Sequence, residues 1–408
     1  MTIRPGPDRA RASRPLGPGE GPLGDIRVVD LTIARAGPTC VRQLADWGAD
    51  VVRVEPPGLT DGVGTGQRLG SDFQNLHRNK RSLTLDLKSE AGHAVFRRLV
   101  ADADVVVENM RPPVKHRLKV DYESVRAINP RVVYGSISGL GQEGPHSGRG
   151  GFDQIAQGMG GLMSVTGVPG QGPLRVGVPI ADLAAGMYLS IGILVALHER
   201  ERSGEGQWVT TSLVEAMIAM LDFQAARWTI DGDVPSSEGN HHPTQTPMGC
   251  FATADGHLNI GASSPNLWRS FCEATGLGAL VDDPRFARGA ARYANRTELI
   301  ALIEERLATR PTSEWVDVLS EAGVPAGPVY AIDEMFDDPQ VRHLDMLAPV
   351  VHPELGDLAL LRNAVSLSRT PYPVRQASPG AGEHSDAVLA ELGYSAEEID
   401  QLRSDWVV

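Results

Sequence analysis

Asp182 is the residue whose place in the sequence most directly suggests chemistry. It is the only charged residue between positions 177 and 197, and the apolar residues that follow it recur at helical spacing. Burying an unpaired charge costs free energy. Asp182 therefore either caps the amino end of a helix, which is the commoner role of Asp at such a position, or is a carboxylate retained for a reaction.

Two basic clusters are candidate anion sites in a chain that is acidic as a whole. The cluster at residues 77–81 precedes a predicted strand, and is either a solvated face or an anion site. The second cluster follows a strand that ends at Glu108, and it contains Arg111, Lys115, His116, Arg117 and Lys119. Ligands of α/β sheets bind beyond the carboxyl ends of strands, and Arg forms bidentate contacts with phosphate. Two such clusters would suit a ligand with several phosphates.

The remaining motifs are weaker. Residues 135–177 are rich in glycine, which allows backbone to approach a ligand closely, although tight turns alone would explain them. No Gly-x-Gly-x-x-Gly follows the first predicted strand, and no P-loop, His-Glu-x-x-His or Cys-x-x-Cys occurs. His241 and His242 precede Pro243 in a polar loop, which we interpret as a loop pair. No metal site is predicted.

The predicted elements around these residues alternate between strand and helix. Strands are expected at 26–31, 50–55, 82–87, 104–108 and 131–137, and helices at 36–47, at 90–101 after a Ser89 cap, after an Asp121 cap, and at 182–203. This alternation predicts an α/β fold with a mostly parallel open sheet. Residues 208–230 are expected to form a strand and then a helix.

We expect four segments along the chain. Residues 1–24 are interpreted as a disordered tail, 25–230 as the first part of a large domain, 231–335 as a small α+β domain, and 336–408 as a return to the large domain. The small domain should begin with a hairpin at 249–260 that turns at Asp255 and Gly256. Helical patterns then continue to about residue 322.

Bulk composition excludes several classes of protein. The 408 residues carry 38 Lys and Arg against 51 Asp and Glu, and the net charge of −13 disfavours nucleic acid as a partner. Three scattered cysteines, Cys40, Cys250 and Cys272, favour a reducing compartment and therefore a cytoplasmic protein. The longest apolar run, 186–197, is too short to span a bilayer, so no membrane partner is expected.

Taken together, the motifs resemble those of the family III CoA-transferases, the group of formyl-CoA transferase and carnitine CoA-transferase. The resemblance extends from about residue 24 to 408, and its specificity lies in the order and spacing of the motifs. They stand at residues 36–38, 48–58, 79–88, 104–109, 129–131, 203–207, 327–329 and 382–386.

The resemblance implies a large Rossmann-like domain built from both chain ends, a small domain, and a homodimer of interlocked subunits. It assigns the covalent nucleophile to Asp182 and a nearby acidic role to Asp153. No cofactor is expected to be tightly bound, because coenzyme A and acyl-CoA are substrates. The implied CoA contacts are Ala34, Arg35, Asn79, Lys80, Arg81, Asn109, Arg117 and Leu118.

The implied reaction needs neither ATP nor metal. Asp182 attacks an acyl-CoA thioester to give a mixed anhydride, the released thiolate converts this to an aspartyl-CoA thioester, and an acceptor acid reverses the steps. Backbone N–H groups should stabilise each oxyanion. The candidate glycines are Gly139, Gly141, Gly160 and Gly161.

The chain departs from formyl-CoA transferase at two places. Arg35 stands where that enzyme would have Gln, and residues 239–247 replace a multi-glycine lid. Arg35 would either alter recognition of the acceptor or add a phosphate contact, and the missing lid argues against oxalate and formate as the substrates. Arg35, His241, His242 and Gln245 would suit a carboxylate-bearing substrate, with a dicarboxylate such as succinate as donor by analogy.

Two alternatives remain on the same fold. An α-methylacyl-CoA racemase needs proton-transferring groups on both faces of the α-carbon, but the matching positions carry Phe152 and Ser264. A CoA-binding protein without chemistry is the other alternative, and the presence of Asp182 argues against it.

Overall fold

The computed structural model describes residues 21–58 and 67–408. Most of the predicted tail, residues 1–20, lies outside this part of the chain. Residues 21–24 form a turn, in which the N–H of Leu23 donates to the carbonyl of Trp47 at 2.9 Å. Residues 21–24, which the prediction assigned to the tail, are therefore part of the described structure.

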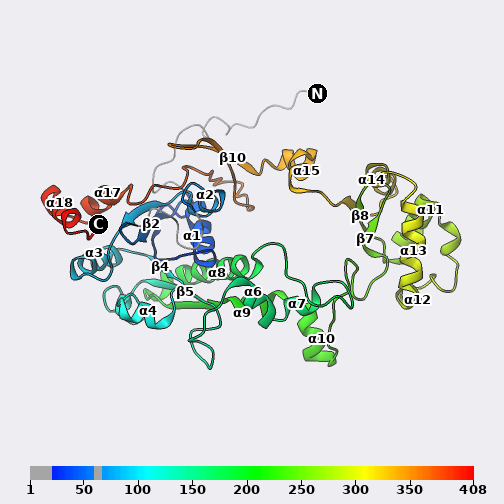
Figure 1. Ribbon diagram of the computed structural model, residues 1–408, viewed down its shortest axis with the longest axis horizontal. Coiled ribbons are helices and arrows are strands. Elements are labelled where there is room, and N and C mark those ends of the chain that lie inside the picture. Colours follow the sequence, from blue (N-terminus) through cyan, green and yellow to red (C-terminus); the bar gives the residue numbers. More distant parts are fainter. Residues whose placement is uncertain (1–20, 59–66) are drawn as a thin grey trace. The chain divides into compact units, whose positions relative to one another are not determined.

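The centre of the first unit is a six-stranded sheet in which every neighbouring pair is parallel (Figure 1). Its order is β3-β2-β1-β4-β5-β6, so the chain changes direction across the sheet between β1 and β4. The strands are β1 (Arg27–Asp30), β2 (Asp50–Glu55), β3 (Arg81–Thr84), β4 (Val105–Glu108), β5 (Val133–Ser138) and β6 (Trp208–Ser212). This confirms the predicted parallel α/β sheet, and the reversal point is where such sheets hold ligands.

Successive side chains of a strand point to opposite faces of the sheet, so those of this sheet enter two different cores. Val28 packs with α1 (Ala36–Asp46) and α8 (Ile180–Ser203), whereas Val29 packs with α3 (Glu90–Ala101) on the opposite face. The first core also takes in α6 (Asp153–Met159) and α9 (Leu213–Met220). The second contains residues of α5 (Tyr122–Arg126), α17 (Ser385–Glu391) and α18 (Ala396–Ser404). The C-terminal helices thus share a core with the first strands.

Local signals worked well where an element had a cap or a clear period. Ser89 accepts from Gly92 N at the start of α3, and Asp121 accepts from Ser124 N at the start of α5, which confirms both predicted caps. The short helices α2 (Ser71–His77), α4 (Pro112–Arg117), α6 and α7 (Leu162–Val165) were not predicted, because one or two turns show little periodicity.

Two predicted elements differ in extent. β3 ends at Thr84 rather than residue 87. After β6 the chain forms two helices, α9 and α10 (Phe223–Asp231), where one was expected. The break between them lies beside Asp222, whose φ of 45° is left-handed and cannot continue a helix.

Helix α8 is longer than the apolar run at 186–197 suggested. It has 24 residues and ends at Gly204, which adopts a left-handed φ of 77°. By length and composition it could cross a membrane, which corrects the expectation that no segment is long enough. Half of its most apolar 18-residue stretch is buried inside the described chain, and the buried apolar residues of α8 belong to the first core. The absence of a membrane partner stays a prediction.

The second unit comprises Met163–Arg175 and Arg227–Leu344, and the first unit the remaining residues. Its sheet has the order β7-β8-β9, with β7 (Met248–Ala252), β8 (His257–Gly261) and β9 (Ala326–Pro328), so the predicted hairpin is confirmed. Its helices are α11 (Pro265–Thr275), α12 (Gly289–Ala294), α13 (Arg296–Leu307), α14 (Thr312–Glu321), α15 (Ile332–Asp337), α16 (Pro339–Leu344) and the 3₁₀ turn Gly278–Leu280. Segment 163–175 joins this unit through the hydrogen bond from Gly239 N to Gly167 O.

A separate hairpin, β10 (Leu347–His352) and β11 (Gly356–Leu361), follows in the first unit.

Candidate active site

Asp182 lies in the first turn of α8, but it is not the helix cap. Pro179 occupies the cap position, which makes Asp182 the third helical residue. Its carboxylate has no hydrogen bond or ion pair with any residue in the described part of the chain. The capping role is therefore wrong, and the carboxylate is left available for another purpose.

Asp153 performs the capping role that Asp182 does not. One of its oxygens, Oδ1, accepts from the N–H of Ala181 at 2.8 Å and more weakly from that of Asp182 at 3.4 Å. The other, Oδ2, accepts from Gln157 Nε2 at 2.7 Å. These bonds satisfy donors that a helix start leaves unpaired, and they hold α6 against the first turn of α8.

The surroundings of Asp182 oppose its ionisation. Burial raises the pKa of this carboxyl to about 6, the negative charge of Asp153 adds to the increase, and the Arg35 guanidinium partly offsets it. A carboxyl with a pKa near 6 is ionised at neutral pH while remaining poorly solvated. Such a group is a better nucleophile than a fully hydrated carboxylate, since less water must be removed before it attacks.

Arg35 stands on the loop between β1 and α1, and this loop is held firmly. Asn109, at the end of β4, accepts from Ile33 N at 2.9 Å and donates to Ile33 O at 2.7 Å. Ala34 adopts a left-handed φ of 58°. The side chain of Arg35 donates through Nη2 to Asp72 Oδ2 at 2.5 Å. Asn109 is itself a predicted CoA contact, and it positions the loop that carries two other predicted contacts, Ala34 and Arg35.

Helix α1 approaches the first turns of α8 closely, which brings the Arg35 loop toward Asp182. A Cβ on Gly186, one turn after Asp182, would lie 2.7 Å from Ala36 O and 2.8 Å from Thr39 Cβ. Only glycine fits this contact. The close approach explains why the charge of Arg35 acts on Asp182.

The basic cluster at residues 77–81 is not a solvated face. Lys80 is fully buried and donates to Asp30 Oδ2 at 2.9 Å, and Arg78 forms a two-point bond with Asp46. Asn79 also donates to Asp46, and Arg81 is bonded to Asp50 and Glu391. These side chains use their donors on carboxylates of the same unit. A contact between them and CoA stays a prediction, and their internal bonds do not favour it.

The second basic cluster is divided between the core and the surface. Lys115 is buried and donates to Glu108 Oε1 and Gln142 Oε1, both at 2.8 Å. Arg117 is exposed and Leu118 half-buried at the end of α4, beyond the carboxyl end of β4. Arg117 and Leu118 therefore remain accessible for the predicted CoA contact, whereas Lys115 does not.

Three of the four candidate oxyanion glycines already use their N–H groups. Gly141 N donates to Ser138 Oγ, Gly160 N to Ala156 O, and Gly161 N to Gly158 O. Gly139 packs tightly against Gly151, since a Cβ on either would lie 2.6 Å from the other's Cα. These glycines shape the loops near Asp153, and the geometry does not favour Gly141, Gly160 or Gly161 as oxyanion donors.

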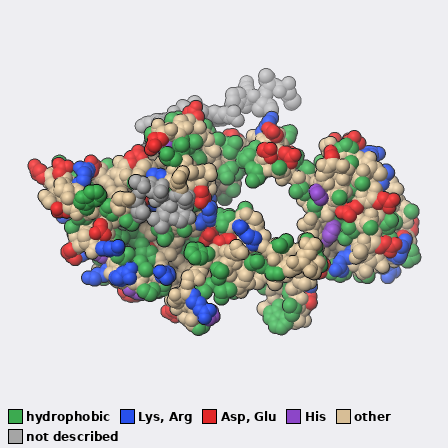
Figure 2. All heavy atoms as spheres, viewed as in Figure 1, with side chains coloured by type: hydrophobic (Ala, Val, Ile, Leu, Met, Phe, Trp, Pro, Cys, Tyr) green, Lys and Arg blue, Asp and Glu red, His purple; other side chains and the backbone are tan. Residues whose placement is uncertain are grey.

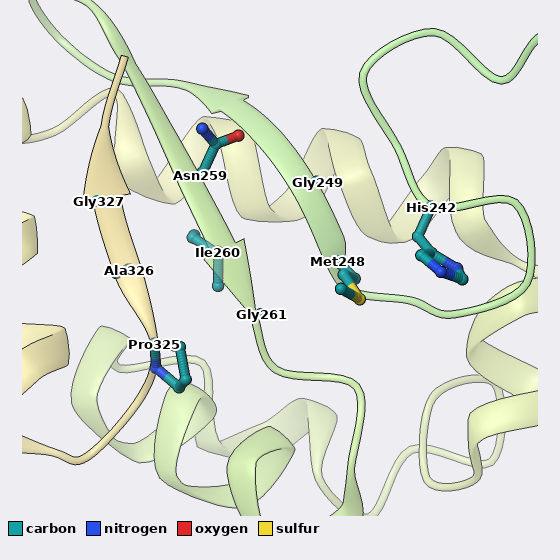
Figure 3. A pocket seen from close by; sticks show the side chains of 9 residues that line it. All are labelled: His242, Met248, Gly249, Asn259, Ile260, Gly261, Pro325, Ala326 and Gly327. Carbon is teal, nitrogen blue, oxygen red and sulfur yellow. The ribbon is translucent and has the colours of Figure 1, made fainter. Parts of the chain in front are cut away.

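The remaining candidates lie in the second unit. His241 packs its ring 5.2 Å from that of Phe251, and burial lowers its pKa. His242 borders an open pocket of about 530 Å³ on the β7-β8-β9 sheet (Figure 3). Gln245 accepts from Ser263 Oγ at 2.8 Å. Their predicted role toward a substrate carboxylate stays a prediction.

The racemase positions carry structural roles here. Phe152 is exposed and precedes α6, while the Ser264 side chain caps α11 by accepting from Leu267 N. Among the described residues, no three His, Cys, Asp or Glu side chains gather as a metal site. All three cysteines are free.

Asp72 is the site residue that the sequence did not reveal. It lies in the unpredicted helix α2, 37 positions after its partner Arg35. No local pattern connects these two residues, and only the packing of α2 beside α1 brings them together.

Comparison with known proteins identifies the class to which this fold and site belong. The family model for CoA-transferase family III matches residues 23–385. Succinate–glutarate CoA-transferase of Agrobacterium fabrum is 37% identical over 91% of this chain and 96% of the relative. Succinyl-CoA:mesaconate CoA-transferase of Haloarcula hispanica is 37% identical over 91% of this chain and 97% of the relative.

A solved structure is similar over most of the chain. That of a CaiB/BaiF family protein from Brucella suis aligns with a TM-score of 0.81 at 36% identity, and covers 91% of this chain and 100% of the other. The chain belongs to CoA-transferase family III. It is therefore a CoA-transferase.

Proposed function

We propose that this enzyme transfers CoA between dicarboxylic acids, with Asp182 as the covalent carrier of the acyl group. The observation that carries the proposal is the partly buried carboxylate of Asp182, which has no hydrogen-bond partner in the described part of the chain and a pKa of about 6. A structural aspartate would be paired or solvated. An unpaired one at the start of a helix suits a nucleophile whose charge is consumed when it reacts.

Each step of the proposed exchange moves one acyl bond. Asp182 attacks the thioester carbonyl of the donor, so a mixed anhydride forms and CoA leaves as its thiolate. The thiolate then attacks the aspartyl carbonyl, which produces an aspartyl-CoA thioester and releases the donor acid. The acceptor carboxylate attacks that thioester, and the same steps run in reverse. No external reductant, ATP or metal enters the balance.

The helix start assists the charged forms of this cycle. The amino end of α8 carries partial positive charge that favours an ionised Asp182, and Arg35 acts in the same direction. Asp153 keeps the first turn in place through Ala181. When the carboxylate becomes an anhydride or thioester, its negative charge disappears, and so does the cost of keeping that charge beside Asp153.

A dicarboxylic substrate is supported by the relatives and by the charge of Arg35. The two curated relatives described above are named for succinate with glutarate and for succinyl-CoA with mesaconate. Asp182 needs only one carboxylate of such an acid for the exchange. The second carboxylate remains charged throughout, and the positive charge of Arg35, which already acts on Asp182, favours an anion there.

We also propose that the enzyme acts as a homodimer. Helices α6, α8 and α9 of the first unit leave apolar side chains exposed. An apolar cluster also lies over α10 (Figure 2), where Phe223, Trp228 and Ile230 are exposed. The exposed residues are Phe152, Ile155, Met159, Met187, Tyr188, Ile191, Val195, Ile218, Met220, Phe223, Trp228 and Ile230. Exposed apolar side chains in such number on the helices of the first unit are typical of a protein interface.

The direct test is to trap the acyl-enzyme. Incubation with succinyl-CoA followed by hydroxylamine should convert Asp182 alone to a hydroxamate, detected by mass spectrometry of peptides. Asp182→Asn should abolish both the label and CoA exchange, with a loss of at least about 1,000-fold in rate. Exchange by the Asn variant, or a label on another residue, would refute the mechanism. Deuterium incorporation at the α-carbon of a 2-methylacyl-CoA would instead support the racemase.

A further inference from the structure

The helices α1 and α2 carry opposite charges that meet at both ends of their contact. At one end Arg35 donates to Asp72, and at the other Arg78 donates to Asp46. These two ion pairs look equivalent in sequence, since each joins one residue of the α1 region to one of the α2 region. Their hydrogen bonding shows that they are not.

The Arg78 pair is closed, meaning that its hydrogen-bonding groups are almost all used within the protein. Its Nε and Nη2 donate to the two oxygens of Asp46, and its Nη1 donates to the carbonyl and side chain of Asn75. Both side chains of the pair are 2% exposed. A guanidinium in this arrangement has almost no capacity left for a ligand, so Arg78 is a structural residue.

The Arg35 pair is open, meaning that most of the hydrogen-bond donors of Arg35 are unused. Its only hydrogen bond to a described residue runs from Nη2 to Asp72 Oδ2, which leaves most of its five N–H donors without an acceptor. Its side chain is 27% exposed and that of Asp72 is 35% exposed. Arg35 also lies on the loop that α1 presses toward the start of α8, near Gly186. A ligand held at Asp182 can therefore reach the unused edge of this guanidinium.

We propose that Arg35 binds the second carboxylate of a dicarboxylic acyl group, and that Asp72 is the positioning residue that turns the unused edge of Arg35 toward Asp182. This deepens the proposed function, because it names the group that distinguishes dicarboxylic from monocarboxylic acyl chains. A guanidinium and a carboxylate match as a two-point pair. Asp72 accepts from one N–H of Nη2, so the other N–H of Nη2 and those of Nε and Nη1 stay available for the ligand.

The charge of the same contact supports an anionic ligand. Arg42 lies on α1, two turns after Arg35. It has no ion pair or hydrogen bond with any of the described residues, 21–58 and 67–408. Burial lowers its pKa to about 10, and the positive charges of Arg78 and Arg35 contribute to the decrease. The contact between α1 and α2 thus carries more positive than negative charge, which an additional carboxylate would balance.

The test compares two acyl-CoA donors in three variants. Succinyl-CoA and butyryl-CoA have four-carbon acyl groups and differ in the second carboxylate. Assays at pH 8 keep Asp182 ionised, so that loss of the Arg35 charge acts through substrate binding and not through the pKa of Asp182. Arg35→Gln should lower kcat/KM for succinyl-CoA by about 10- to 100-fold, and that for butyryl-CoA much less.

Arg42→Gln is the matched control, because it removes a positive charge from the same helix without removing the proposed contact. It should leave the ratio of the two kcat/KM values within about 3-fold of the wild type. Asp72→Ala should raise KM for succinyl-CoA with little change in kcat, and Asp72→Asn, which still accepts a bond from Arg35, should recover most of the loss.

Equal loss on both donors in Arg35→Gln, which leaves the ratio of the two kcat/KM values unchanged, would overturn the proposal. A ratio that falls equally in Arg42→Gln would show that the general charge of the helix, and not a contact with Arg35, sets the preference. Hydroxylamine trapping at Asp182 is measured in parallel. A label on Asp182 with an unchanged ratio refutes only this inference, whereas the absence of a label in the wild type refutes the proposed mechanism.

Discussion

Two sets of carboxylates in the first unit differ in how completely they are bonded. Asp30, Glu55 and Glu108 end β1, β2 and β4, and each is buried and paired with a cation: Lys80, Arg53 with Arg68, and Lys115 respectively. Hydroxyl groups of Thr32, Ser82 and Ser136 complete their bonding. Around the start of α8, by contrast, Asp182 has no partner among the described residues and Asp72 is partly exposed.

This difference separates scaffold from site. A buried carboxylate with all its acceptors used cannot bind a ligand without losing a bond, so the strand-end set fixes the ends of the sheet. The carboxylates around α8 retain unused acceptors close to a helix start, and the neighbouring Arg35 retains unused donors. Both sets contain the same residue types, so the degree of bonding, and not the identity of the side chains, indicates which of them does chemistry.

The largest effect should come from opening a closed pair. Asp30→Ala leaves the Lys80 ammonium buried without a carboxylate, and it also removes the acceptor for Thr32 N and Oγ1. Removing one partner of a buried pair costs about 3–5 kcal/mol. We expect a loss of that size in the free energy of unfolding, measured by urea denaturation followed by circular dichroism.

The control for this prediction is Asp72→Ala, which opens the exposed pair instead. Exposed ion pairs contribute less than about 1 kcal/mol, so this variant should unfold close to the wild type. Equal destabilisation by the two substitutions would mean that the bonding of a carboxylate does not distinguish scaffold from site.

The second prediction concerns the cost of keeping Asp182 ionised. Its pKa of about 6 lies above the ordinary 3.8, so the folded state binds this proton more tightly than the unfolded state. Stability is therefore lost as the pH rises from about 4 through about 6, and the full cost is present above that range. Asp182→Asn removes this cost and should stabilise the protein at pH 8 but not at pH 4.

The gain at pH 8 is at most about 3 kcal/mol, at about 1.4 kcal/mol for each pH unit. Thermal unfolding at several pH values measures it. Asp357→Asn, at an exposed position of β11, is the control and should show no comparable gain. If the Asn variant of Asp182 is no more stable than the wild type at pH 8, the pKa of the Asp182 carboxyl is not raised in the folded protein.

The sequence predicted the sheet but not the bonding that defines the site. Hydrophobic strands alternating with capped helices predicted the parallel α/β sheet, and Ser89 and Asp121 located helix starts closely, because these signals lie within a few residues of one another. The open or closed state of Arg35, Arg78 and Lys80 depends on partners 30 to 50 positions away. No local pattern contains that information.

The same limitation applies to two of the alternatives that the sequence left open at the site. Residues 77–81 were expected to be a solvated face or an anion site because their carboxylate partners are distant in sequence, whereas the cluster is largely buried. A helix cap was one of the two roles considered for Asp182, because the true start of α8 at Ile180 is weakly marked. The residue that satisfies that helix start, Asp153, stands 28 positions earlier and belongs to an unpredicted helix.

The smallest predicted effect concerns Asp153, which combines features of both sets. Asp153→Ala removes the acceptor for Ala181 N and should destabilise the protein by about 1 kcal/mol, as loss of a helix cap does. Asp153→Asn keeps an acceptor oxygen and should cost less. Both substitutions remove the negative charge that raises the pKa of Asp182, so the acid limb of kcat/KM should move to lower pH in both. Urea denaturation and a pH–rate profile measure the two effects separately. If the limb moves only in the Ala variant, the shift follows from disorder in the first turn of α8 and not from the charge of Asp153.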